Sequence, residues 1–95
     1  MQKRKTLAVH PGEILKDEME ERDISINALA RALRVPPNRV SAIINGKRSI
    51  TADTAHRLGR FFGTSAGMWM NLQAEYDLRS VDAARIAREV LPHAS

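Results

Sequence analysis

Side chains that can recognise the edges of DNA bases follow the Pro36-Pro37 pair near the middle of the chain. If a helix begins at the second proline, Val40, Ile43 and Ile44 share its apolar side. The positions then left exposed are Asn38, Arg39, Ser41, Ala42 and Asn45. Asparagine pairs with adenine through two hydrogen bonds, arginine does the same with guanine, and an alanine methyl contacts a thymine methyl.

We therefore predict that four of these residues read bases: Asn38, Arg39, Ser41 and Ala42. Two of them also have a simpler interpretation. Arg39 is otherwise an arginine on a solvated surface, and Asn38 is otherwise a local cap in the first turn of the helix.

Three residues at the end of the same segment are predicted to contact phosphates: Asn45, Lys47 and Arg48. Phosphate contacts of this kind hold a protein in register on the duplex without reading its sequence. For Lys47 and Arg48 the alternative is a simple solvated loop. Asn45 also has a structural interpretation, because Asn-Gly is a common helix stop whatever the function.

The net charge of +4 is unevenly distributed along the 95 residues. Residues 24–63 contain seven basic residues and one acid, which gives this segment +6, whereas residues 11–23 carry −4. A strongly basic segment is where an anionic partner is expected to bind. The N-terminal Lys3-Arg4-Lys5 is either a solubilising tail or an arm that reaches DNA or a protein partner.

The spacing of apolar residues predicts an all-α fold with five helices and an additional C-terminal helix. The expected helices cover residues 11 to about 22, 26–33, 37 to a stop at Gly46, 52–62, a segment beginning at Ser65, and 81–91. The residues expected to cap four of them are Ser25, Thr51, Ser65 and Ser80. In the helix over 52–62 the side chains expected to point inward are Ala55, Leu58, Phe61 and Phe62. The length suits a single domain, residues 1–95, with one modest core.

The second and third expected helices form the layout of a helix-turn-helix over approximately residues 25–45. A tight turn at 34–36 joins them, because a residue that precedes a proline is pushed out of the helical region. Apolar residues lie where the two helices must cross, and Ala30 is small enough for a close approach. In this motif the second helix enters the DNA major groove, so the residues predict binding to double-stranded DNA.

The last third of the chain contains more apolar surface than one small monomer can cover. Met68, Trp69, Leu72 and Tyr76 recur there at helical spacing. For Trp69 and Tyr76 a position in the core is the alternative. We predict a homodimer whose interface lies in approximately residues 65–91 and includes these four side chains.

Several classes of function are disfavoured because the chain lacks the residues that they require. The chain has no cysteine, which excludes a disulfide framework and a thiolate metal site. The three histidines are too scattered for a metal site, and no glycine-rich phosphate loop or paired-carboxylate site is present. We therefore expect neither an enzyme nor a cofactor. No apolar run approaches the roughly 18 to 20 residues that span a bilayer, so we expect a cytoplasmic protein with no membrane partner.

Residues 24–48 resemble the lambda-repressor-like helix-turn-helix domains, also called the XRE or Cro/C1 type. The residues that carry this resemblance are Leu29-Ala30, Leu33, Val35, Val40, Ile43 and Asn45-Gly46-Lys47. A longer series of motifs, spread over residues 9–78, is similar to the HigA antitoxins. In chain order these motifs are HPGEIL (10–15), VPPNRV (35–40), INGKR (44–48), ITADTA (50–55) and MWMNLQ (68–73).

The resemblance to HigA implies a homodimer that binds an inverted-repeat operator, represses its own operon and neutralises a co-encoded HigB toxin. Such toxins are RelE-like, ribosome-dependent mRNA endonucleases. The alternative is a stand-alone XRE-type transcriptional repressor without a toxin partner. A third interpretation, a protein-interaction module that does not read DNA, is disfavoured by the basic segment. The acidic first helix is either a solvated face or a surface that holds a basic toxin.

Two positions depart from the usual XRE pattern. Ile26 stands where these domains usually have a glutamine that contacts a phosphate. We expect that contact to come instead from N–H groups near Ser25 or from the side chain of Asn27. Arg34 stands where the family usually has glycine in a left-handed turn, and it is expected to carry strain of order 1 kcal/mol.

Overall fold

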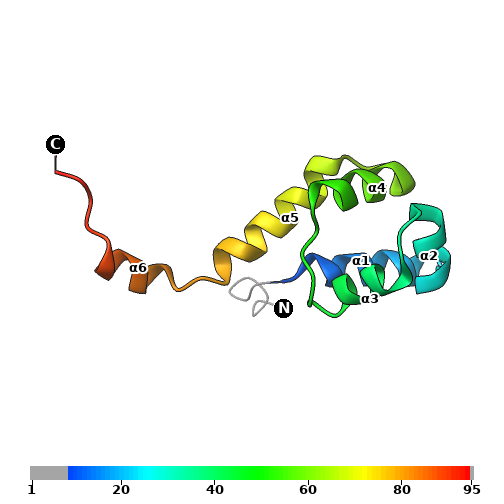
Figure 1. The fold of residues 1–95 in the computed structure, drawn as a ribbon, viewed down its shortest axis with the longest axis horizontal. Helices are drawn as coiled ribbons and strands as arrows, with labels where there is room; N and C mark the ends of the chain where they lie inside the picture. The colour runs from blue at the N-terminus through cyan, green and yellow to red at the C-terminus, as the bar shows by residue number, and fades with distance from the viewer. Residues whose placement is uncertain (1–8, 95) are drawn as a thin grey trace.

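The computed structural model describes residues 9–94, which form six α-helices and no strand (Figure 1). The helices are α1 (Pro11–Glu21), α2 (Ile26–Leu33), α3 (Pro37–Ile44), α4 (Ala52–Phe62), α5 (Ala66–Arg79) and α6 (Ala83–Glu89). The predicted all-α fold is confirmed, and the predicted bounds of α2 and α4 agree residue for residue. The N-terminal Lys3-Arg4-Lys5 lies outside the described residues.

Short-range hydrogen bonds explain why the helices begin where they do. The hydroxyl of Ser25 accepts from the Ala28 N–H at 3.1 Å, and that of Thr51 accepts from the Thr54 N–H at 3.4 Å. Ser65 caps α5 in the same way, with the Met68 N–H at 3.0 Å from its hydroxyl. Each cap satisfies one of the backbone donors that a helix N-terminus leaves without a partner. These three predicted caps are confirmed.

The predicted start of the last helix is wrong. Asp82 caps α6, because its carboxylate accepts from the Arg85 N–H at 3.1 Å. Ser80 instead ends α5, where its hydroxyl donates to the Tyr76 carbonyl at 2.8 Å. The helix is consequently shorter at both ends than the predicted 81–91.

Helix α1 is fixed at its beginning by a buried histidine. The ring Nδ1 of His10 accepts from the Gly12 N–H at 2.9 Å, and the ring meets Tyr76 of α5 edge to face at 4.8 Å. Gly12 allows α1 to approach α3, because a Cβ atom there would overlap the backbone carbonyl of Ile43. The first helix is thus held against both α3 and α5.

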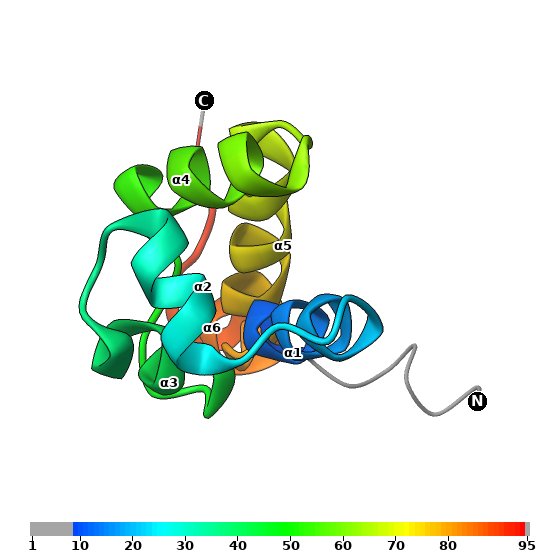
Figure 2. The ribbon, with the colours of Figure 1, turned by 90° about the vertical axis from the view of Figure 1, so that its right-hand side faces the viewer.

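The core lies between the first five helices, which surround it in the view of Figure 2. Its buried residues are Leu15, Met19, Leu29, Ala30, Leu33, Val40, Ile43, Ile50, Ala55, Leu58 and Trp69. The expectation that Phe61 points inward is wrong, since 40% of it is exposed. Helix α4 buries the face that contains Ala55 and Leu58, and the helical rotation turns Phe61 away from that face.

Helix α6 stands apart from this core. It projects beyond the end of α5, away from α1 to α4 (Figure 1), and packs against none of the other helices. None of its residues is buried. Ile86 is 40% exposed, and Val90 and Leu91 just after the helix are 65% and 78% exposed. Its apolar side therefore has no partner within residues 9–94. No helix in that range is long and apolar enough to cross a membrane.

Candidate nucleic-acid interface

The turn between α2 and α3 has the geometry of a helix-turn-helix. Arg34 adopts φ 62° and ψ 44°, which is the left-handed conformation. The N–H of Val35 donates to the Ala30 carbonyl at 3.0 Å, so the turn closes back on the last turn of α2. For a residue with a side chain this conformation costs about 1 to 2 kcal/mol. The left-handed turn expected at Arg34 is confirmed.

Helix α3 has one side in the core and one side facing out. Val40 and Ile43 are each 1% exposed, and Ile44 is partly buried. The four residues predicted to read bases lie on the rest of the helix. Asn38 is exposed, whereas Arg39, Ser41 and Ala42 are half-buried. All four belong to one short helix, so they can reach adjacent base pairs in one groove.

The guanidinium of Arg39 is held by an acid on the next helix. Its Nη1 lies 3.3 Å from Oδ2 of Asp53, which is in the first turn of α4. The side chain of Arg39 is 26% exposed and that of Asp53 is 58% exposed. Arg39 is therefore neither buried nor free to sample every rotamer.

Asp53 also pairs with Arg57, and Arg57 in turn contacts the end of α2. Nε of Arg57 donates to Oδ2 of Asp53 at 2.8 Å, and Nη1 of Arg57 donates to the Leu33 carbonyl at 3.0 Å. That carbonyl is one of the acceptors that the end of α2 leaves without a helical partner. The hydrogen bond from Arg57, with its charge and that of Arg39, holds the pKa of Asp53 below its usual value. The same Asp53 partner raises the pKa of Arg57.

This network was not predicted from the sequence. One signal was available, because Asp53 and Arg57 are four residues apart on a helix, the spacing of a common ion pair. No sequence pattern links Asp53 to Arg39, since the two lie fourteen residues apart on different helices.

The two basic residues predicted to contact phosphates follow the end of α3. The N–H of Lys47 donates to the Ala42 carbonyl at 2.8 Å, and Gly46 has φ 74°, so the chain turns sharply away from the helix. Lys47 and Arg48 are both exposed. The loop that carries them is anchored further on, where the N–H of Ile50 donates to Gln73 at 2.7 Å.

The start of α2 offers a second region for phosphates. Asn27 is exposed there, and the neighbouring Ile26 is 36% exposed. The hydroxyl of Ser25 is already used as the helix cap. The groups at this helix start that can still contact an anion are the side-chain amide of Asn27 and the positive end of the helix dipole.

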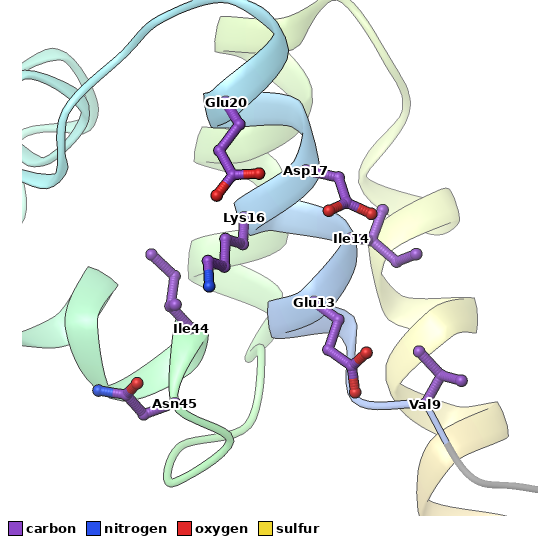
Figure 3. Close-up of a pocket in the computed structure, with 8 residues that line it drawn as sticks. All are labelled: Val9, Glu13, Ile14, Lys16, Asp17, Glu20, Ile44 and Asn45. Atoms are coloured by element: carbon purple, nitrogen blue, oxygen red, sulfur yellow. The ribbon is translucent and has the colours of Figure 1, made fainter.

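Asn45 lies in a different electrostatic setting from Lys47 and Arg48. It lines a hollow of about 410 Å³ between α1 and the end of α3, shown in Figure 3. The carboxylates of Glu13, Asp17 and Glu20 line the same hollow, together with the single cation of Lys16, so the lining is acidic on balance. These acids disfavour a phosphate at Asn45, and its position as the α3 C-cap agrees with a structural role.

The four residues predicted to form a dimer interface do not share one environment. Met68 is 37% exposed, and Leu72 and Tyr76 are half-buried. Trp69 is only 1% exposed, because its ring fills the core and its Nε1 donates to the Thr64 hydroxyl at 3.1 Å. Placing Trp69 at a dimer surface was therefore wrong. Its alternative, a position in the core, agrees with the structure.

Comparison with known proteins identifies the fold that these features build. Residues 15–69 match the family model described as helix-turn-helix. The chain belongs to the XRE-type helix-turn-helix family. The matched range begins within α1 and ends within α5, so it contains α2, α3 and α4 in full.

Relatives in this family include regulators and antitoxins. Virulence-associated protein I of Dichelobacter nodosus is 49% identical over 76 residues, which are 79% of this chain and 70% of that protein. The uncharacterized HTH-type transcriptional regulator YbaQ of Escherichia coli is 47% identical over 73 residues, which are 76% of this chain and 65% of YbaQ. The solved structure of the Pseudomonas aeruginosa antitoxin HigA with the higBA promoter is 52% identical and has a TM-score of 0.85. That match covers 92% of this chain and 99% of the HigA chain, so the resemblance to HigA antitoxins is confirmed.

Proposed function

We propose that this chain is a sequence-specific DNA-binding antitoxin that represses its own operon and neutralises a HigB-like, RelE-type mRNA endonuclease. The observation that carries the proposal is the outward side of α3, with Asn38 and Arg39 in a segment of charge +6. The P. aeruginosa HigA with its promoter has the same fold at 52% identity. A small basic helix-turn-helix with this relative is best explained as an operator-binding protein.

In the proposed complex α3 lies in the major groove. Arg39 reads guanine, Asn38 reads adenine, and Ser41 and Ala42 complete the contacts to bases. Lys47 and Arg48 meet one stretch of phosphates, and the start of α2 with Asn27 meets another. Asn45 is left out of the phosphate contacts, because the hollow that it lines holds three carboxylates and only one cation, Lys16.

We propose that the operator-binding form is a homodimer. The exposed apolar side of α6, together with Met68, Leu72 and Tyr76 of α5, supplies the surface. A two-fold dimer places two copies of α3 on the same side of the duplex, so its operator is an inverted repeat. The two half-sites are then about 34 Å apart, or a multiple of that distance.

DNA binding is tested by selection from a pool of random duplexes with the purified chain. We expect the selected sequences to contain an inverted repeat, and the affinity for it to fall steeply as salt is raised. A pool that shows no enriched sequence after repeated rounds contradicts operator binding.

The antitoxin half is tested by co-expression with the product of the adjacent reading frame. We expect the toxin to be basic, opposite in charge to the acidic α1 of this chain, so the two proteins should co-purify. The toxin should stop growth when it is expressed alone. If the chain selects an operator but recovers no partner, the protein is a stand-alone XRE-type repressor. YbaQ, which is named an uncharacterized HTH-type transcriptional regulator, is one relative whose name agrees with this second candidate.

A further inference from the structure

An acid lies beside the arginine that is proposed to read a base. Oδ2 of Asp53 is 3.3 Å from Nη1 of Arg39, and the two residues come from different helices, α4 and α3. Ion pairs on a protein surface are common and need no function of their own. This one matters because it restrains the guanidinium that is proposed to meet a base.

The acid is itself held in place. Nε of Arg57 binds the same Oδ2 at 2.8 Å, and Nη1 of Arg57 binds the Leu33 carbonyl at 3.0 Å. The contacts thus run from the end of α2 through Arg57 and Asp53 to Arg39. Both helices of the helix-turn-helix and α4 are joined by this one chain of hydrogen bonds. The carboxylate of Asp53 is consequently a fixed point against which Arg39 is oriented.

We propose that Asp53 is a positioning residue for base reading, which holds the guanidinium of Arg39 in the orientation that meets a guanine. This inference rests on the proposed DNA-binding function. A free arginine loses rotamer freedom when it forms two hydrogen bonds to a base, and a side chain already held by an ion pair loses less. A guanidinium has five N–H donors, so one contact to Asp53 leaves donors for the base.

The proposal predicts that Asp53→Asn affects two measured quantities differently: the affinity for unrelated duplexes and the preference for the correct base pair. Asp53 carries the single negative charge in the basic segment 24–63, and a carboxylate close to DNA repels phosphates. Asp53→Asn removes that repulsion, so affinity for unrelated duplexes stays equal or rises. The same change frees Arg39, so the preference for the correct base pair falls. A loss of fold lowers both quantities and does not reproduce this pattern.

The experiment measures binding of wild-type, Asp53→Asn, Arg39→Ala and the double variant to the selected operator and to operators with single base-pair changes. The base pair at which Arg39→Ala loses discrimination defines the position read by Arg39. At that position we expect Asp53→Asn to lose about five-fold in discrimination, a few-fold effect typical of ordering one side chain. In the Arg39→Ala background Asp53→Asn should not change discrimination at that position any further. With Arg39 present, Asp53→Glu should keep part of the preference that Asp53→Asn loses.

Glu18→Gln is the matched control, because it removes one carboxylate from another ion pair between residues four apart, Glu18 of α1 and Arg22, the C-cap of that helix. It should leave discrimination unchanged at every position. Unchanged or increased discrimination in Asp53→Asn, with Arg39→Ala still defective, overturns the positioning role and leaves the proposed function intact. If wild-type protein prefers no sequence, or Arg39→Ala keeps full discrimination, it is the proposed base reading that fails.

Discussion

The side-chain carbonyl of Gln73 accepts a hydrogen bond from the backbone N–H of Ile50, with 2.7 Å between the two heavy atoms. Gln73 is on α5 and only 4% exposed, and Ile50 lies in the loop between α3 and α4. The bond therefore fixes the loop that carries Lys47 and Arg48 to a helix distant in sequence. The amide nitrogen of Gln73 is used as well, since it donates to Asp77 at 3.0 Å.

Gln73→Leu should destabilise the protein by about 1 to 3 kcal/mol, because it leaves the buried N–H of Ile50 without an acceptor. The free energy of unfolding, measured by urea denaturation followed by circular dichroism, checks this value. Asp77→Ala is the control, since it removes only the part-buried bond that the Gln73 amide donates, and it should cost less than Gln73→Leu, which removes both bonds. Equal effects of the two variants would show that the buried bond contributes nothing of its own.

Arg34→Gly should stabilise the protein by about 0.5 to 1 kcal/mol. Glycine avoids the cost of about 1 to 2 kcal/mol that a left-handed conformation imposes on other residues, although part of the gain is lost to the greater freedom of the unfolded chain. Asp23, with φ 55°, offers a comparison within the same chain. Asp23→Gly should gain less, because a short polar side chain tolerates this region better. A lower midpoint of thermal unfolding for Arg34→Gly would contradict strain at this turn.

Features set by neighbouring residues in the chain were predictable from the sequence. The bounds of α2 and α4 depend on capping residues and on a proline or glycine close by, so Ser25, Thr51 and Gly63 define them locally. The left-handed turn at Arg34 followed from its position in the family pattern. The outward residues of α3 followed from which positions are apolar.

Features set by packing between helices were not predictable in the same way. Helical spacing shows that Trp69 and Leu72 share a face, but not that other helices already cover Trp69 within the monomer. The network from Leu33 through Arg57 and Asp53 to Arg39 depends on how α2, α3 and α4 meet. Its members lie up to 24 residues apart along the chain, and no local sequence pattern predicts a contact over that separation.

Arg39→Ala and Lys47→Ala should weaken DNA binding in different ways. Loss of the base contact should cost about 1 to 3 kcal/mol of discrimination at one base pair, whereas loss of a phosphate contact should weaken all sequences alike. The logarithmic salt dependence should become shallower by about 0.9 for Lys47→Ala, because one phosphate is no longer neutralised. Fluorescence anisotropy distinguishes the two kinds of contact. It is measured at several salt concentrations with the operator and with operators that carry a single base-pair change. A uniform loss for Arg39→Ala would place that residue on the phosphates.

Stability should depend on pH through Asp53. Its pKa is lowered in the folded protein, chiefly by the hydrogen bond from Arg57 and then by the nearby positive charges. The ion pair therefore contributes in full above the unfolded pKa, which is about 3.9, and its contribution is lost as the pH falls through the lower folded pKa. The difference in urea midpoint between wild type and Asp53→Asn should be largest near neutral pH and should shrink below about pH 4. High salt should reduce it too, because the site is exposed. A difference that stays constant from neutral to acid pH would contradict a stabilising charge at Asp53.

The seven residues of α6 should fold only against a partner. An isolated helix shorter than about 12 to 15 residues is marginal in water, and α6 buries none of its residues against α1 to α5. A second copy of the chain covers the apolar side of α6 in the proposed dimer, so Ile86→Asp should shift sedimentation equilibrium from dimer to monomer. Phe61→Asp is the matched control, because Phe61 is 40% exposed like Ile86 but lies on α4. The control variant should remain dimeric. Dimers that persist in Ile86→Asp would locate the interface elsewhere, whereas a monomeric wild type would contradict the proposed dimer itself.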